Sequence, residues 1–139
     1  MSLKFSRLDP RAAAPSRKHP SDAGVDVYAN EDLTIAPFNS RAVRTGLTFE
    51  IPAGTLLQVW PKSRHNHLVG AGVIDAGYQG EILIKVVNYS WKPMRIRCGD
   101  AVAQLVQVPV ITEQLEELPQ EEIHRMHSAR GGEGGIHLK

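Results

Sequence analysis

Short runs of β-branched and other apolar residues, separated by turn-forming residues, recur along most of this chain. Runs of this kind predict strands at 25–29, 33–36, 42–43, 47–51, 55–60, 71–74, 82–88, 94–96 and 101–110. Proline, glycine, asparagine and aspartate gather between them, for example at 37–40 and 98–100, and mark turns. Short strands at this spacing favour an all-β barrel or sandwich.

The remaining segments complete the predicted domain organisation. A helical pattern occurs only at 113–126, where Pro119 divides it. A chain of 139 residues is the size of one domain and can bury a modest core. We assign residues 1–127 to the β-domain and residues 128–139 to a glycine-rich C-terminal tail, which we expect to be flexible without a ligand.

Charge and cysteine content argue against several classes of protein. The formal net charge is +1, which gives no strong field toward nucleic acid or a membrane surface. The single cysteine, Cys98, excludes an internal disulfide framework and fits a reducing compartment. The sequence shows neither a signal-peptide pattern nor an apolar run of about 18–20 residues. We therefore expect a soluble, cytoplasmic protein with no nucleic-acid or membrane partner.

Residues 70–88 carry the clearest chemical signal. Asp75 stands between an apolar run and a Gly-Tyr-Gln-Gly turn, and a second strand-like run follows at 82–87. Two such runs around a short glycine-containing connection predict a β-hairpin. A carboxylate near a bound phosphate ester can orient a water molecule and accept its proton, which makes Asp75 a candidate general base. The alternatives are a turn aspartate that caps its own hairpin and, for Tyr78, an ordinary hairpin aromatic.

Residues 72–81 resemble the third sequence motif of the trimeric dUTP diphosphatases, or dUTPases. Four further segments resemble the family's other motifs in the family's order: 22–27 the first, 61–63 the second, 99–106 the fourth and 130–135 the glycine-rich fifth. The resemblance spans residues 20–136. It implies an all-β, jelly-roll-like β-barrel of the dUTPase type that assembles as a homotrimer.

The resemblance also implies an activity. That activity is hydrolysis of dUTP to dUMP and pyrophosphate by attack of water on the α-phosphorus, which limits uracil in DNA and supplies dUMP. Asp75 would hold the water and contact the sugar 3′-hydroxyl. Tyr78 would pack on the deoxyribose and leave no space for a 2′-hydroxyl. Main-chain groups of the predicted hairpin would read uracil, with Gly72, Val73 and Ile74 as the residues implied.

Phosphate contacts are implied for several separate segments. Basic and amide side chains can donate to phosphate oxygens, and glycines allow close backbone N–H groups. The residues implied for the phosphates and for covering the base are Lys62, Ser63, Arg64, Gln104, Arg130, Gly134, Gly135 and Ile136. Asp26 and Asp100 resemble acids that support the site indirectly. They are equally readily interpreted as strand and turn residues.

Magnesium is the expected cofactor, bound through substrate phosphates and water rather than by the protein directly. A triphosphate supplies its own oxygen ligands, and Mg²⁺ keeps several waters. Zinc is a weaker alternative, suggested by His65 with His67 and by His124 with His127, but no third ligand stands at a useful spacing.

Some features depart from the family pattern. Eleven residues separate Ser63 from Asp75, fewer than usual, and residues 64–67 replace the usual small residue and helical turn. Val69 stands where many relatives have asparagine, and Ile136 replaces the phenylalanine expected to stack on uracil. These departures support one alternative, a nucleotide-binding or interaction module with weak or no turnover. A dCTP deaminase is disfavoured, because Lys85 stands where that branch carries an acid.

Overall fold

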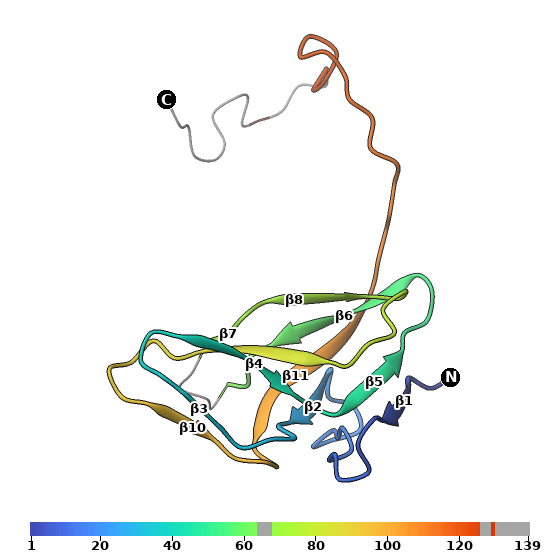
Figure 1. Cartoon of the computed structure of the whole chain (residues 1–139). Coiled ribbons are helices and arrows are strands. Elements are labelled where there is room, and N and C mark those ends of the chain that lie inside the picture. The colour runs from blue at the N-terminus through green and yellow to red at the C-terminus, as the bar shows by residue number, and fades with distance from the viewer. Residues whose placement is uncertain (64–67, 126–128, 130–139) are drawn as a thin grey trace.

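The computed structural model describes residues 1–63, 68–125 and 129 (Figure 1). Within these residues the structure contains strands and no helix. The strands are β1 (Lys4–Arg7), β2 (Gly24–Tyr28), β3 (Leu33–Ile35), β4 (Ser40–Arg44), β5 (Leu47–Glu50), β6 (Thr55–Trp60), β7 (Leu68–Val69), β8 (Gly72–Asp75), β9 (Leu83–Val87), β10 (Met94–Ile96) and β11 (Ala101–Pro109). The all-β prediction is confirmed.

The predicted strands are found close to their expected bounds, but β1 and β7 were missed. All four residues of β1 are exposed, so this strand has no alternation of buried and exposed positions that a sequence pattern would reveal. β7 has only two residues. The helix predicted at 113–126 is wrong for the residues described there, 113–125. Those residues are exposed, and a short helix without an apolar face packed on a core is marginal in water.

Antiparallel pairing arranges the strands into four sheets. The largest has the order β2-β11-β6-β8, and a second has the order β4-β9-β7. β1 pairs with β5, and β3 pairs with β10. Fully buried side chains from all four sheets form one core, so the strands make a jelly-roll-like β-barrel. The largest are Ile35, Leu47, Leu57, Ile82, Ile84 and Leu105.

The predicted hairpin over 70–88 is wrong. β8 pairs with β6, whereas β9 pairs with β4 and β7, so the two runs belong to different sheets. A tight turn does follow β8, since the Tyr78 backbone N–H donates to the Asp75 carbonyl at 3.0 Å. The chain then continues away from β8, and the Ile82 N–H donates to the Leu47 carbonyl at 2.8 Å. That contact directs β9 into the other sheet, where Ile84 and Val86 are fully buried.

Two buried polar side chains form hydrogen bonds to the backbone of the connections between strands. The Thr45 hydroxyl donates to the Ile82 carbonyl at 2.7 Å. The Asn88 amide donates to the carbonyls of Ile35 and Lys92 at 3.0 and 2.8 Å. Both side chains are fully buried, so these hydrogen bonds offset the cost of removing them from water.

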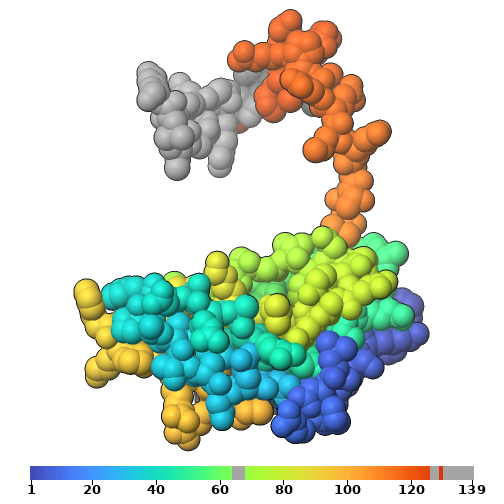
Figure 2. Space-filling view, in the orientation of Figure 1, coloured from blue at the N-terminus to red at the C-terminus, as the bar shows by residue number. Residues whose placement is uncertain are grey.

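After β11 the chain leaves the sheets. Residues 110–125 form an extended projection above the barrel (Figures 1 and 2). Two of their apolar side chains are almost completely exposed, Ile111 at 85% and Leu115 at 98%. The predicted domain boundary at 127 stays a prediction. The described residues contain no helical segment that could span a membrane.

Candidate active site

A cavity of about 270 Å³ lies beside β8 and the turn that follows it. The sequence-predicted residues Gly72, Val73, Ile74, Asp75 and Tyr78 all line it. The remaining lining residues are Val59, Glu81, Ile82 and Leu83, which sequence reasoning missed. Val59 lies opposite Gly72 in the β6–β8 pairing, a neighbour that only the observed register reveals.

Asp75 is the last residue of β8, and its side chain is exposed. Its backbone carbonyl accepts the hydrogen bond from Tyr78 that closes the turn. Its carboxylate, in contrast, forms no hydrogen bond or ion pair with any residue in the described part of the chain. The carboxylate therefore does not cap its own turn, and both oxygens are available to a ligand in the cavity.

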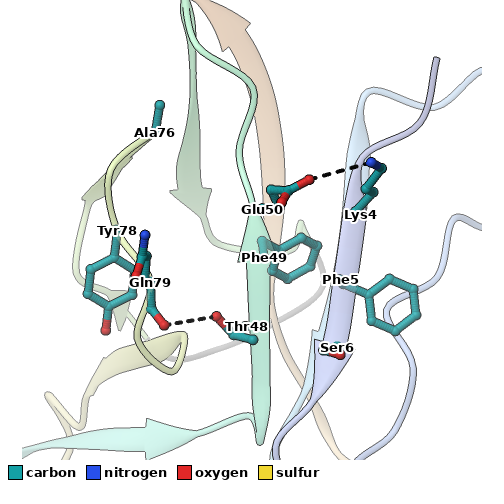
Figure 3. A pocket seen from close by; sticks show the side chains of 9 residues that line it. All are labelled: Lys4, Phe5, Ser6, Thr48, Phe49, Glu50, Ala76, Tyr78 and Gln79. Atoms are coloured by element: carbon teal, nitrogen blue, oxygen red, sulfur yellow. Dashed lines mark hydrogen bonds and ion pairs between the residues drawn. The ribbon is translucent and has the colours of Figure 1, made fainter.

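The Tyr78 ring is held by the turn itself. Its hydroxyl donates to the Glu81 carbonyl at 2.6 Å, and the side chain remains 42% exposed. A Cβ added at Gly80 would lie 2.7 Å from the Tyr78 hydroxyl oxygen, so the ring position requires glycine there. Tyr78 also borders a second cavity, of about 390 Å³, toward β5 and β1 (Figure 3). Tyr78 thus borders two open spaces.

A second group of predicted residues lies near the opposite end of β6. The Lys62 ammonium pairs with the Asp26 carboxylate at 2.6 Å, and both side chains are largely buried. The Gln104 amide donates to the Pro61 carbonyl at 3.0 Å. Ser63 is an exposed residue in the turn after Lys62. This group therefore places a cation, an amide and a hydroxyl near the end of one sheet, where the ammonium is paired with Asp26 and the amide with the Pro61 carbonyl.

One chain does not bring these two groups together. Asp75 lies opposite Leu56 near the start of β6, whereas Gln104 lies opposite Trp60 at its end. Four residues of strand separate the two positions by about 13 Å, and Lys62 lies further on. The groups are also on different neighbours of β6, because Asp75 is in β8 and Gln104 is in β11.

Asp100 occupies a turn. Its carboxylate accepts a hydrogen bond from the Arg97 backbone N–H at 2.9 Å. Gly99, just before it, has a φ of 94°, a conformation that favours glycine. Asp100 thereby fixes the turn that leads into β11, the strand that carries Gln104.

Other predicted residues lie outside the described ranges. These are Arg64, Arg130, Gly134, Gly135 and Ile136, together with His65, His67 and His127 of the zinc alternative. Across residues 1–63, 68–125 and 129, no group of three or more histidine, cysteine, aspartate or glutamate side chains is placed to hold a metal ion.

The clearest pKa shifts in the described residues occur away from both groups. Asp9 accepts hydrogen bonds from the backbone and side chain of Arg11 and from Asn30, which lower the pKa of its carboxyl from 3.8 to about 2. The side-chain hydrogen bond to Asp9 and the negative charge of that carboxylate raise the pKa of Arg11.

Comparisons with known proteins agree on one family. A family model described as dUTPase matches residues 10–136. A deoxyuridine 5′-triphosphate nucleotidohydrolase of Picosynechococcus is 39% identical, over 80% of this chain and 82% of the relative. The enzyme of the same name from Mycobacterium tuberculosis is 38% identical, over 96% of this chain and 92% of the relative.

Solved structures give the same result. A variant of the Staphylococcus bacteriophage 80alpha dUTPase with dUpNHpp superposes with a TM-score of 0.85 at 25% identity, covering 96% of each chain. A variant of the dUTPase from phage phi11 of S. aureus has a TM-score of 0.81 at 25% identity, covering 88% of this chain and 99% of that one. The latter structure describes the coordination of a structural Mg(II) ion.

Proposed function

The chain belongs to the dUTPase family and is a dUTP diphosphatase, and we propose that it hydrolyses dUTP in the cavity lined by Asp75 and Tyr78. One observation supports this location above the others. The Asp75 carboxylate is exposed, borders the cavity, and has no partner among the described residues. A catalytic carboxylate needs that freedom, since it must reach a water molecule bound beside the substrate.

Asp75 acts as the general base in this proposal. Its carboxylate accepts a proton from a water molecule as the water oxygen bonds to the α-phosphorus. The bond between the α-phosphorus and its bridging oxygen to the β-phosphorus breaks, so dUMP and pyrophosphate are the products. The bridging oxygen leaves with the pyrophosphate. No covalent intermediate with the protein is needed.

The cavity also suits recognition of the nucleoside. The backbone of Gly72, Val73 and Ile74 lines it and offers main-chain groups to uracil. The Tyr78 ring would lie against the deoxyribose, where a 2′-hydroxyl would meet the ring. Main-chain recognition of the base and steric exclusion at the sugar would together select dUTP over UTP.

Magnesium is the cofactor, and the described residues fit a metal held by substrate rather than by protein. They contain no cluster of ligands for a metal ion, and Mg²⁺ prefers phosphate oxygens and water. When bound with the triphosphate, Mg²⁺ would offset the negative charge on the phosphate oxygens. Lys62, Ser63, Arg64 and Gln104 would contact those oxygens by donating hydrogen bonds. From the tail we propose Arg130, Gly134 and Gly135 for the phosphates and Ile136 over the base.

We further propose that the protein works as a homotrimer with shared sites. Asp75 and the group formed by Lys62, Ser63 and Gln104 lie toward opposite ends of β6, about 13 Å or more apart, so they do not meet at one phosphate within a chain. A second copy that places its Lys62 group beside Asp75 would complete the site, and the tail of one chain would close a site built by another. A cytoplasmic location is also proposed, since the single exposed cysteine suits a reducing compartment.

Release of pyrophosphate from dUTP by the purified protein tests the activity directly. We expect stoichiometric dUMP and pyrophosphate, with dCTP left intact. Binding of dUTP without product would favour the module with weak or no turnover. Ammonia release from dCTP would instead indicate a deaminase.

A further inference from the structure

Glu81 connects the turn that carries Tyr78 to the neighbouring sheet. One carboxylate oxygen accepts a hydrogen bond from the Gly46 backbone N–H at 2.9 Å. The other oxygen accepts from the Arg44 guanidinium at 3.2 Å. The Glu81 side chain is only 17% exposed, whereas the Arg44 side chain is 63% exposed. Hydrogen bonds to a carboxylate are among the stronger ones in proteins, so this contact restrains the turn.

The Tyr78 ring depends on the backbone that Glu81 restrains. Its hydroxyl donates to the Glu81 carbonyl, and its ring packs against Gly80 with no room for a Cβ. Both supports of the ring therefore lie at or directly before Glu81. A shift of Glu81 would therefore carry the ring with it, at a place where Tyr78 borders two cavities.

We propose that Glu81 is a positioning residue that fixes the Tyr78 ring and thereby sets the discrimination between deoxyribose and ribose. This inference rests on the proposed function, since it assumes that Tyr78 faces the sugar. A steric wall excludes a 2′-hydroxyl only when the wall cannot retreat, and small displacements in a site have large effects. Tyr78 is 42% exposed and borders two cavities, so packing alone does not hold the ring in place. The contacts of Glu81 hold it instead.

Other contacts keep the segment folded when Glu81 is replaced. The Thr45 hydroxyl and the Leu47 carbonyl hold Ile82, and the Thr48 hydroxyl donates to the Gln79 carbonyl at 3.3 Å (Figure 3). Loss of the Glu81 carboxylate should thus loosen the ring without unfolding the connection. The expected effect is on sugar choice more than on stability.

The test compares binding of two non-hydrolysable analogues, α,β-imido-dUTP and α,β-imido-UTP, by calorimetry. In Glu81→Ala we expect the ratio of the two affinities to fall by roughly tenfold, within the range that one steric contact provides. Glu81→Gln should give a smaller fall, because its amide oxygen can still accept from Gly46. Glu50→Gln is the matched control, since the exposed Glu50 carboxylate pairs with Lys4 and, among the described residues, forms no hydrogen bond or ion pair with the turn.

A second variant acts on the ring without touching the carboxylate. In Gly80→Ala the new Cβ displaces the ring, so the affinity ratio should fall as in Glu81→Ala. Wild-type ratios in both variants would overturn the inference, as would a wild-type protein that binds the two analogues equally or binds neither. Failure of the proposed function would be seen separately, as the absence of dUTP hydrolysis by the wild type. The two failures are distinguishable because the ratio of binding affinities is measured without turnover.

Discussion

Replacing Asp75 by asparagine should separate catalysis from folding and binding. Asparagine keeps the shape of the side chain but cannot accept the proton of the attacking water. Turnover should therefore fall by about 10²-fold or more, the effect of losing a general base. A hundredfold loss corresponds to about 2.7 kcal/mol in the activation barrier. The remaining activity would come from the binding and orientation of the substrate.

The stability of Asp75→Asn should remain near that of the wild type although its turnover falls. The Asp75 carboxylate is exposed and makes no hydrogen bond or ion pair within the described residues, so its replacement removes no native contact. A surface change of this kind alters the free energy of unfolding by less than about 0.5 kcal/mol. The affinity for α,β-imido-dUTP should also stay near that of the wild type.

Pyrophosphate release measures turnover, calorimetry measures affinity, and thermal unfolding measures stability. Glu50→Gln is a suitable control because it removes an exposed carboxylate on another strand. The reasoning is refuted if Asp75→Asn hydrolyses dUTP at nearly the wild-type rate. It is also refuted if the variant loses activity only because it unfolds.

Three further predictions need one measurement each. The specificity constant for UTP should be roughly a hundredfold below that for dUTP because of Tyr78; equal constants would remove the ring from sugar selection. Light scattering should give about three times the chain mass of 15.3 kDa, and a monomer at micromolar concentration would contradict the shared site. Because the Asp9 pKa is lowered to about 2, its stabilising contribution should be full above pH 3.8 and lost as pH falls through 2. Carboxyl NMR titration measures that pKa, and an ordinary value would disprove it.

The sequence predicts strands well because most of them alternate between core and solvent. Residues 55–60 and 94–96 form strands with the predicted bounds. The pairing partner of each strand is harder to predict from the sequence, since it depends on contacts between residues that are distant in the sequence. The sequence predicts a hairpin between β8 and the run at 82–87, but the contact between Ile82 and Leu47 directs that run to another sheet. No local pattern encodes that contact.

The candidate site was predictable to a similar degree. Asp75 and Tyr78 stand close together in the sequence and line one cavity in the structure. Glu81 was missed because its role depends on Arg44 and Gly46, more than thirty positions earlier. The role of Asp26 was left open by the sequence, since its ion pair with Lys62 also joins distant segments.

Asp75 and Gln104 lie toward opposite ends of β6, and this separation leads to a prediction that only a site shared between subunits can satisfy. Asp75→Asn removes the base from one group, and Gln104→Ala removes a phosphate donor from the other. Each homotrimer should be impaired at all of its sites. If subunits of the two variants are mixed, unfolded and refolded together, some sites will combine Asp75 from a Gln104→Ala chain with Gln104 from an Asp75→Asn chain.

Such sites carry neither substitution. With random assembly of equal amounts, about one quarter of all sites should be intact in this way, since each site takes the two groups from neighbouring copies. Pyrophosphate release by the mixture should therefore rise toward a quarter of the wild-type rate, well above the mean of the two variants assayed separately. A site built within a single chain cannot regain activity by mixing. Activity equal to that mean would show that Asp75 and Gln104 of the same chain serve one nucleotide, and the strand geometry of β6 would then have to be reconciled with a site spanning its whole length.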